Sequence, residues 1–420
     1  MEMSREDNAN GRAGGSFKEP GPAPGRVEDV RRGNLVRVLA AIAQARTDPQ
    51  RYPTRAELAS LTGLTKASVS SLVAELADSG LVMESGATRD GERGRPGVGL
   101  QLSTRRGVVG MEINVDYISA GLLDLGGALR ASRTLECGNR GQSPESVMAL
   151  LSGLVNGVVA EAAAAGIEIL GGGLAVPGLV DTASGTVSSA PNLQWHSVAL
   201  ELGGLLPGAP LGTVLYNEAN CAALAELWYG HGLDFRDYLF VSGEVGVGGG
   251  LVIGSRLFAG PHGQAGEVGH VVVDPSGPDC SCGGRGCLET FAGQEAIFAE
   301  AGIPAGTASV RLGQLVEQLD AGNAAATSAV ARAGRYLGIA AASTARLMNL
   351  SAVVLGGHFT RMGPWLAPAV IESLANHAPG VVSPARVAVS ELGQSAALLG
   401  AAGSALRSVL AAPSALTPAG

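Results

Sequence analysis

The sequence predicts a small N-terminal winged helix-turn-helix module followed by a larger α/β body. Residues 27–104 show helical periodicity and then two short strands around a Gly-rich hairpin. Over residues 105–410, apolar strands alternate with Ala-rich helical stretches, the pattern of an α/β fold with mixed sheets. A length of 420 residues suits two or three domains at roughly 150 residues each. Residues 1–26 and 411–420 are expected to be flexible tails.

The composition excludes a mostly disordered chain, because 46% of the residues are hydrophobic and 16% are charged. The formal net charge is −8, but it is unevenly distributed. Residues 26–106 hold 13 basic and 9 acidic residues, whereas residues 107–420 hold 13 basic and 24 acidic residues. A basic module on an acidic body indicates a local contact with a polyanion. The alternative is a difference in surface charge without functional meaning.

Three helices are predicted in the N-terminal module. The segment GNLVRVLAAIAQA places Leu35, Val38, Leu39 and Ile42 on one helical face. Thr54 and Glu57 have the spacing of a capping box that opens a second, short helix, with Leu58 and Leu61 facing inward. Gly63 permits a tight turn, Thr65 caps the third helix, and Gly80 terminates it. The buried stripe predicted for the third helix comprises Val69, Leu72, Val73 and Leu76.

The outer face of the third helix predicts contact with DNA. Small polar and cationic side chains there allow the close approach that a major groove about 12 Å wide requires. Two strands, LVMES and VGLQLS, flank an Arg-bearing hairpin that can act as a wing in the minor groove. The predicted DNA-binding residues are Arg55, Thr65, Lys66, Ser68, Ser70, Ser71, Arg93 and Arg95. The alternative is a three-helix module that binds protein.

No membrane span and no secretory signal are predicted, so the chain is expected in the cytoplasm. The longest apolar candidate, between Glu145 and Glu161, has fifteen residues and contains Ser152 and Asn156. The N-terminus MEMSREDNAN is acidic and polar, without the basic start and apolar middle of a secretory signal. The odd count of five Cys suits a reducing compartment better than a disulfide framework.

A cluster in the segment GQAGEVGHVVVDPSGPDCSCGGRGCLET predicts a metal site. One imidazole and three thiolates form a soft tetrahedral set that suits a structural Zn²⁺ ion and leaves no open position for a catalytic water. The predicted ligands are His270, Cys280, Cys282 and Cys287. The alternative is a Cys-rich turn without a metal and a surface His.

GEVGH followed by CSCGGRGCLE resembles the signature of the ROK family (repressors, open reading frames, kinases), and the resemblance runs from about Asn34 to Leu406. The resemblance implies an actin-like, ribonuclease-H-type body of two lobes with a sugar in the cleft. Fusion to a helix-turn-helix is typical of the family's transcriptional regulators, which include glucose, N-acetylglucosamine and xylose repressors.

The resemblance also implies the sugar ligands, on motifs that this chain retains. They are Asn217 and Glu218 in YNEAN, Glu267 and His270 in GEVGH, and Glu289 in CLE, with further contacts from Asn192 in APNLQW and Gly178 in AVPG. Carboxylates and amides that each engage two adjacent hydroxyls are what a polyol requires. Taken singly, each acidic residue also fits a solvated surface charge.

The two phosphate loops depart from the family's kinases. Kinases open the body with Asp followed by Gly-Gly-Thr or similar, whereas GMEINVDYIS offers Glu112, Asn114 and Asp116. In the second loop, the family's kinases have a sequence similar to Gly-Thr-Gly-x-Gly. This chain instead has Glu244, whose carboxylate repels phosphate, and Val245, which lacks a hydroxyl. The Gly-rich run at 246–250 is a weak nucleotide signal, because glycine also serves close strand packing.

Two further positions favour binding without catalysis. Glu218 takes the position of the family's catalytic Asp and is one methylene longer, and His358 stands where a further glycine is usual in VVLGGHFT. We therefore predict no catalytic residue and a sugar-responsive repressor of carbohydrate genes, a homodimer on a two-fold symmetric double-stranded DNA operator with a monosaccharide effector. The alternatives are an ATP-dependent sugar kinase with a DNA-binding module, and a protein-interaction adaptor. The identity of the sugar stays open.

Overall fold

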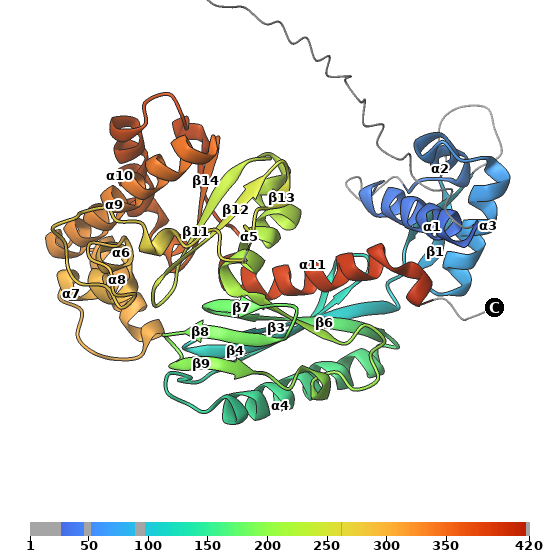
Figure 1. The fold of residues 1–420 in the computed structure, drawn as a ribbon, viewed down its shortest axis with the longest axis horizontal. Helices are drawn as coiled ribbons and strands as arrows, with labels where there is room; N and C mark the ends of the chain where they lie inside the picture. The colour runs from blue at the N-terminus through green and yellow to red at the C-terminus, as the bar shows by residue number, and fades with distance from the viewer. Residues whose placement is uncertain (1–26, 46–51, 89–96, 262, 417–420) are drawn as a thin grey trace, which may run out of the picture.

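The structure, a computed structural model, describes residues 27–45, 52–88, 97–261 and 263–416. Figure 1 shows an N-terminal head beside a body of two lobes, with helix α11 extending from the body toward the head. The fold therefore has the predicted organisation: a helix-turn-helix module and an α/β body with two sheets.

The head contains the three predicted helices and the predicted hairpin. Its elements are α1 (Val27–Gln44), α2 (Arg55–Thr62), α3 (Lys66–Asp78) and the antiparallel pair β1 (Val82–Thr88) and β2 (Gly97–Leu102). The Thr54–Glu57 capping box and the Thr65 cap are both formed, and Gly63 ends α2 with a φ of 69°. The predicted stripes of α1 and α3 are buried.

One expectation for the head is wrong: Leu61 is 68% exposed, whereas Leu58 is fully buried. The buried face of α2 is centred between Leu58 and Ala59, and at about 100° per residue Leu61 lies about 110° away from that centre. Arg93 and Arg95 lie outside the described residues, so their predicted place in a wing stays a prediction.

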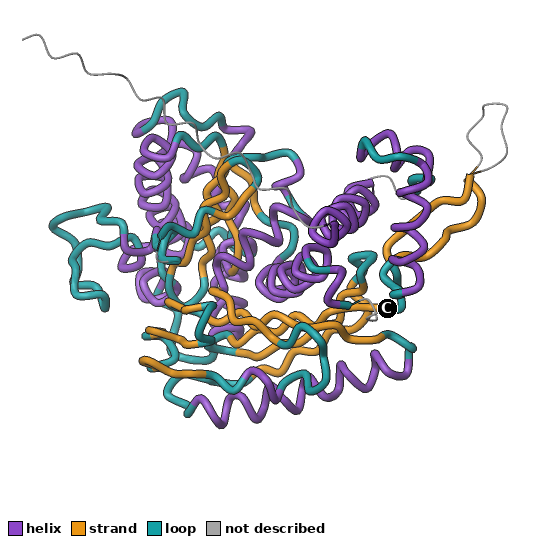
Figure 2. Tube along the Cα trace, turned by 45° about the vertical axis from the view of Figure 1, so that its right-hand side comes forward, coloured by secondary structure: helices purple, strands orange, loops and turns teal. Residues whose placement is uncertain are grey.

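The first lobe is built on a five-stranded sheet in the order β10-β6-β3-β4-β5. Its strands are β3 (Arg106–Ile113), β4 (Tyr117–Asp124), β5 (Leu129–Glu136), β6 (Glu168–Val176) and β10 (Thr213–Asn217). Helix α4 (Pro144–Ala164) crosses between β5 and β6 and lies along one face of the sheet (Figure 2). A small sheet of β7 (Leu179–Asp181), β8 (Thr186–Ala190) and β9 (Trp195–Ala199) follows β6.

The second lobe repeats this topology in the order β13-β12-β11-β14-β15. Its strands are β11 (Tyr238–Gly243), β12 (Val247–Ile253), β13 (Arg256–Leu257), β14 (Ala352–Gly357) and β15 (Val387–Val389). Its helices are α6 (Glu289–Ala292), α7 (Gln294–Ala301), α8 (Ala308–Asp320), α9 (Ala324–Met348) and α10 (Gly363–His377). In both sheets the first three strands in sequence are antiparallel neighbours and the last two add in parallel, as a duplicated actin-like fold requires.

Two helices cross between the lobes. Helix α5 (Glu218–Tyr229) follows β10 of the first lobe but packs on β11 and β12 of the second, and α11 (Ala396–Ala411) follows the second lobe but packs on β3, β4 and β6 of the first. At their crossing, a Cβ on Gly400 would lie 1.7 Å from the carbonyl oxygen of Cys221. Only glycine permits this close approach, so the lobes are joined by a tight helix pair.

The head and the body share one hydrophobic core. Leu35, Leu39 and Leu72 of the head belong to the same buried cluster as Leu406 and Val409 of α11. The predicted flexible tail from residue 411 is wrong for its first part, because α11 runs to Ala411 and a 3-10 helix, η8 (Pro413–Ala415), contacts α1. Helix α11 therefore packs directly against the head.

Helix α4 is long and apolar enough to cross a membrane by length and composition alone, although the sequence suggested that no stretch was. A core helix of a soluble protein passes the same test. One stripe of α4 is buried against the sheet of the first lobe: Val147, Leu151, Val155, Val158 and Ala162. The packing of α4 is that of a sheet-covering helix.

Candidate functional site

A cavity of about 870 Å³ lies between the lobes, and every residue that the resemblance implied as a ligand of the sugar lines it. These residues come from both lobes and from loops far apart in the sequence: Gly178, Asn192, Asn217, Glu218, Glu267, His270 and Glu289. Gln194, His196 and Gln264 also line the cavity and were not among the predicted residues. Gln194 and His196 follow Asn192 closely in the same segment, and this closeness in sequence indicates that they can reach the same cavity.

The junction of β10 and α5 holds Asn217 and Glu218 in place. The Asn217 side chain accepts a hydrogen bond from the backbone N–H of Asn220 at 2.8 Å and donates one to the carbonyl oxygen of Gly178, also at 2.8 Å. Gly178 has a φ of 91°, and a Cβ there would lie 2.2 Å from the carbonyl oxygen of Ser189. The strand-to-helix junction thus fixes the Asn217 amide and presents Glu218, the first residue of α5, to the cavity.

On the opposite side, Glu289 begins α6 and accepts a hydrogen bond from the backbone N–H of Val247 at 3.2 Å. A Cβ on Gly246 would lie 2.1 Å from Oε2 of Glu289 and 3.4 Å from Nδ2 of Asn192. Gly246 therefore provides the space in which two predicted sugar ligands meet. Burial raises the pKa of Glu267 in the neighbouring loop.

Three carboxyl groups lie close together beside this cavity: Glu112 is buried, whereas Glu218 and Glu244 are partly exposed and line the cavity. Nδ2 of Asn114 lies 2.6 Å from Oε1 of Glu218 and 3.5 Å from Oε2 of Glu244. Burial and the adjacent Glu244 raise the pKa of Glu218 to about 8, and burial and Glu112 raise the pKa of Glu244 to about 8. Burial also raises the pKa of Glu112, whose carboxylate accepts hydrogen bonds from Tyr117 and Ser119. Removal from water disfavours the charged form of each group.

The four predicted metal ligands converge. Their ligand atoms all lie within 4.8 Å of one another: His270, Cys280, Cys282 and Cys287. Nδ1 of His270 is 3.7 Å from Sγ of Cys280, and Sγ of Cys282 is 3.7 Å from Sγ of Cys287. Thiolates bound to Zn²⁺ at about 2.3 Å in a tetrahedron lie about 3.8 Å apart, so the geometry fits this ion. The cluster can therefore hold a metal.

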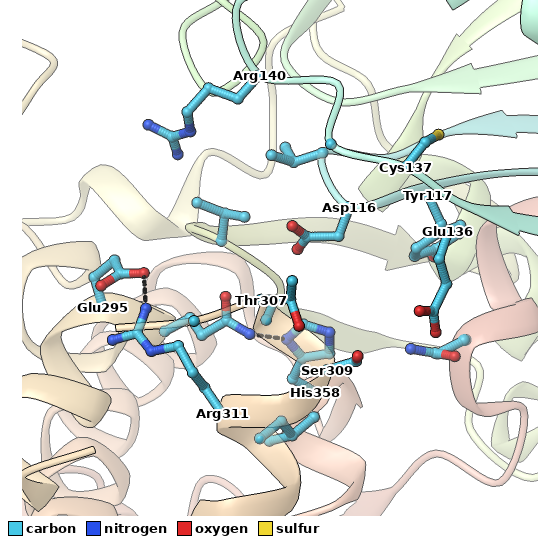
Figure 3. Close-up of a pocket in the computed structure, with 18 of the residues that line it drawn as sticks. Asp116, Tyr117, Glu136, Cys137, Arg140, Glu295, Thr307, Ser309, Arg311 and His358 are labelled. Atoms are coloured by element: carbon cyan, nitrogen blue, oxygen red, sulfur yellow. Dashed lines mark hydrogen bonds and ion pairs between the residues drawn. The ribbon is translucent and has the colours of Figure 1, made fainter. Parts of the chain in front are cut away.

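A second cavity, of about 580 Å³, lies on the other side of Val115 and Val245, which line both cavities. Figure 3 shows Asp116 and His358 facing its interior, with Arg140 above them and the Arg311–Glu295 ion pair to their left. Nδ1 of His358 lies 2.7 Å from Nε2 of Gln294, and its Nε2 lies 3.5 Å from Oε2 of Glu244. Glu244 and His358 thus stand at the boundary of the two cavities.

The Gly-rich run at 246–250 serves packing within the second lobe. A Cβ on Gly248 would lie 3.0 Å from Cβ of Ala219, and one on Gly250 would lie 2.5 Å from Cβ of Ala223. Both contacts are with α5, which crosses this strand. These two glycines permit the close approach of helix and strand. This agrees with the interpretation that the run serves packing and not nucleotide binding.

The predicted DNA-binding residues of α3 lie on one surface of the head. Thr65, Lys66, Ser68, Ser70 and Ser71 are all exposed. The Thr65 hydroxyl also accepts a hydrogen bond from the backbone N–H of Ser68 at 3.1 Å, so its first role is to cap the helix. Arg55 forms an ion pair with Glu84 at 2.8 Å and is thereby turned to the hairpin.

Residues 108–407 match the ROK family. The xylose repressor of Caldicellulosiruptor bescii is 31% identical over 322 residues, which cover 74% of this chain and 80% of the repressor. A ROK family transcriptional regulator, a homologue of the E. coli MLC protein, is similar in structure, with a TM-score of 0.75 and 26% identity over 92% of this chain and 99% of the regulator. A ROK family glucokinase from Streptomyces griseus, solved with glucose and AMPPNP, covers 71% of this chain and 98% of the kinase, with a TM-score of 0.58 and 27% identity.

Proposed function

The chain belongs to the ROK family, and we propose that it is a sugar-responsive transcriptional repressor of carbohydrate genes that acts in the cytoplasm. The observation that carries this proposal is that one chain holds both a large cavity lined by the residues predicted to bind a sugar and a helix-turn-helix head whose core continues into the body. The repressor and the regulator that the chain resembles support the same conclusion.

The head would bind double-stranded DNA as one half of a homodimer. Helix α3 presents Lys66 and three serines on a surface free of bulky apolar side chains, which suits insertion in a major groove. A symmetric dimer places two such helices on half-sites about 34–36 Å apart. Occupancy of the operator then depends on the spacing between the two heads.

Sugar binding would change that spacing through α11. The sugar ligands come from both lobes, so a bound sugar stabilises one angle between the lobes. Helix α11 belongs to the second lobe by sequence, packs on the sheet of the first, and shares its core with the head. A change of lobe angle therefore displaces α1 and α3 together.

We assign a structural Zn²⁺ ion to His270 and the three thiolates. The ion would fix the loop between η4 (Val268–His270) and α6, which positions Glu267 and Glu289. With Nδ1 of His270 directed at Cys280, the other ring nitrogen, Nε2, is left for the sugar cavity. The ion would act on structure, because four protein ligands leave no position for a reacting water.

Kinase activity would be lost in this chain. Phosphoryl transfer depends on donors that cradle the phosphates, whereas Glu244 places a carboxylate at the boundary where they would pass. The glucokinase likeness keeps a kinase as the competing function. Incubation with ATP, Mg²⁺ and a hexose panel separates the two, because turnover above about 1 s⁻¹ belongs to a kinase.

The main test is binding of promoter DNA, measured by fluorescence anisotropy over a range of salt, with and without sugars. We expect specific binding that a sugar changes, and Lys66→Ala should reduce the slope of log K against log salt by about 1. Arg256→Ala, on exposed β13 of the body, is the matched control and should leave the slope unchanged. Equal affinity for random and promoter duplexes, with no response to any sugar, would refute the proposal.

A further inference from the structure

Four carboxylates line the sugar cavity and no strong cation balances them. The acidic lining residues are Glu218, Glu244, Glu267 and Glu289. Among the described residues, no Lys or Arg lines this cavity, and His270 has its Nδ1 directed at the thiolates. Arg140 and Arg311 line the second cavity instead (Figure 3), as does Arg361.

Glu244 lies beside Glu218 in this cavity, at the same Asn114 amide. Its side chain is 19% exposed and lines the sugar cavity, with Oε2 3.5 Å from Nδ2 of Asn114 and 3.5 Å from Nε2 of His358. The same Asn114 amide nitrogen donates to Glu218, so two carboxylates share one donor. A ligand group that reaches Glu218 therefore also meets Glu244.

We infer that Glu244, with Glu218, makes the cavity selective for sugars without negative charge, so that the effector is an unphosphorylated, non-acidic sugar. The inference rests on the proposed function and narrows its ligand class. It concerns a position at which this chain departs from the kinases that it resembles, since a carboxylate stands in the second phosphate loop.

The physical reason is that four acidic side chains line the cavity and, among the described residues, no Lys or Arg does. Proteins bind phosphate esters with Arg, Lys or free backbone N–H groups at a helix N-terminus. At the N-terminus of α5, the side chain of Asn217 already accepts from the N–H of Asn220, and Glu218 adds its own carboxylate. Like charges brought together in a site shielded from water repel strongly, which is how binding sites reject the wrong ligand.

A neutral sugar is not repelled by the carboxylates of the cavity, because it carries no negative charge. Each carboxyl group can accept from a hydroxyl when ionised, and when protonated it can also donate, so a polyol is satisfied in either state. The pKa of Glu218 and of Glu244 is raised to about 8, so both groups are largely protonated at pH 7 and become charged as the pH rises through 8. The repulsion of a charged sugar is therefore strongest above pH 8. A phosphate would add further negative charge at the same point.

The test compares matched ligand pairs by isothermal titration calorimetry on the full chain at pH 9, where Glu218 and Glu244 are ionised. The probes are xylose, glucose and N-acetylglucosamine, each with its phosphate ester, and glucuronic acid beside glucose. We expect at least one neutral sugar to bind and its charged partner to bind at least about 100-fold more weakly, which corresponds to about 2.8 kcal/mol. A phosphate ester that binds as tightly as its parent sugar would overturn the inference while leaving the proposed function standing. Failure of every sugar, charged or neutral, would instead overturn the proposed function.

Two variants assign the selectivity to Glu244. Glu244→Gln keeps the shape and removes the charge, so the affinity ratio between sugar and sugar phosphate should fall at least about tenfold, or about 1.4 kcal/mol. Glu201→Gln, an exposed carboxylate outside the cavity, is the matched control and should leave the ratio unchanged. A ratio unchanged in a folded Glu244→Gln protein, as judged by its thermal melt, would show that Glu244 does not select the ligand.

Discussion

A single methyl group at Gly246 should damage sugar binding while leaving the fold intact. In Gly246→Ala, the new Cβ would lie 2.1 Å from Oε2 of Glu289, a distance at which the carboxylate must move. Glu289 is anchored by the backbone N–H of Val247 at 3.2 Å, and this hydrogen bond breaks when the carboxylate is displaced. The second contact, 3.4 Å to Nδ2 of Asn192, is tight but can relax.

The magnitude follows from the interactions that are lost. A hydrogen bond to a charged group contributes about 1.5–3 kcal/mol, and the displaced Glu289 also loses its bonds to the sugar hydroxyls. Sugar affinity should therefore fall by about 10–100-fold. The free energy of unfolding without sugar should change less, because the carboxylate is part-exposed and can rotate toward the cavity.

Calorimetric titration with the neutral sugar that binds the unaltered chain measures the first quantity, and urea unfolding measures the second. Gly204→Ala is the matched control, since a Cβ there meets nothing within 4 Å and its φ is not in the left-handed region. Unchanged sugar affinity in Gly246→Ala would show that Glu289 does not hold the sugar in the way proposed.

Three further predictions concern stability. Cys282→Ser, or removal of metal by a chelator, should lower both the melting temperature and sugar affinity, with zinc followed by elemental analysis. Gly400→Ala should cost at least about 1–3 kcal/mol in urea unfolding, because its Cβ would lie 1.7 Å from a backbone oxygen of α5, whereas Gly313→Ala, with open space in α8, should cost nothing. The raised pKa of Glu218 and of Glu244, to about 8, means that the folded state holds protons that the unfolded state releases above about pH 4.5. Stability should then fall from about pH 5 to 8, by up to about 1.4 kcal/mol per pH unit for each proton, and less in Glu218→Gln or Glu244→Gln.

Local signals made the head predictable from the sequence. The capping box at Thr54 and Glu57, the turn at Gly63 and the buried stripe of α3 depend on spacings of a few residues, and all are present in the structure. Leu61 was misassigned because a three-residue spacing alone does not fix the centre of a helix face. In so short a helix, the buried face is decided by the neighbouring helices.

The candidate site was predictable only as a set of residues. The motifs supplied Asn217, Glu267 and Glu289, but their convergence on one cavity depends on the pairing of distant strands. The proximity of Glu244 to Asn114 joins residues 130 apart in the chain. The sequence could identify a carboxylate that repels phosphate, but the tertiary fold was needed to place it between two cavities.

The crossing of α5 and α11 provides a physical link between the proposed sugar site and the head. Each helix belongs to one lobe by sequence and packs on the sheet of the other, so neither lobe can rotate without moving the helix pair. Glu218, a proposed sugar ligand, begins α5, and Leu406 near the end of α11 lies in the core of the head. Because packed interiors transmit displacement instead of absorbing it, a change at one end of this pair reaches the other without a flexible linker between them.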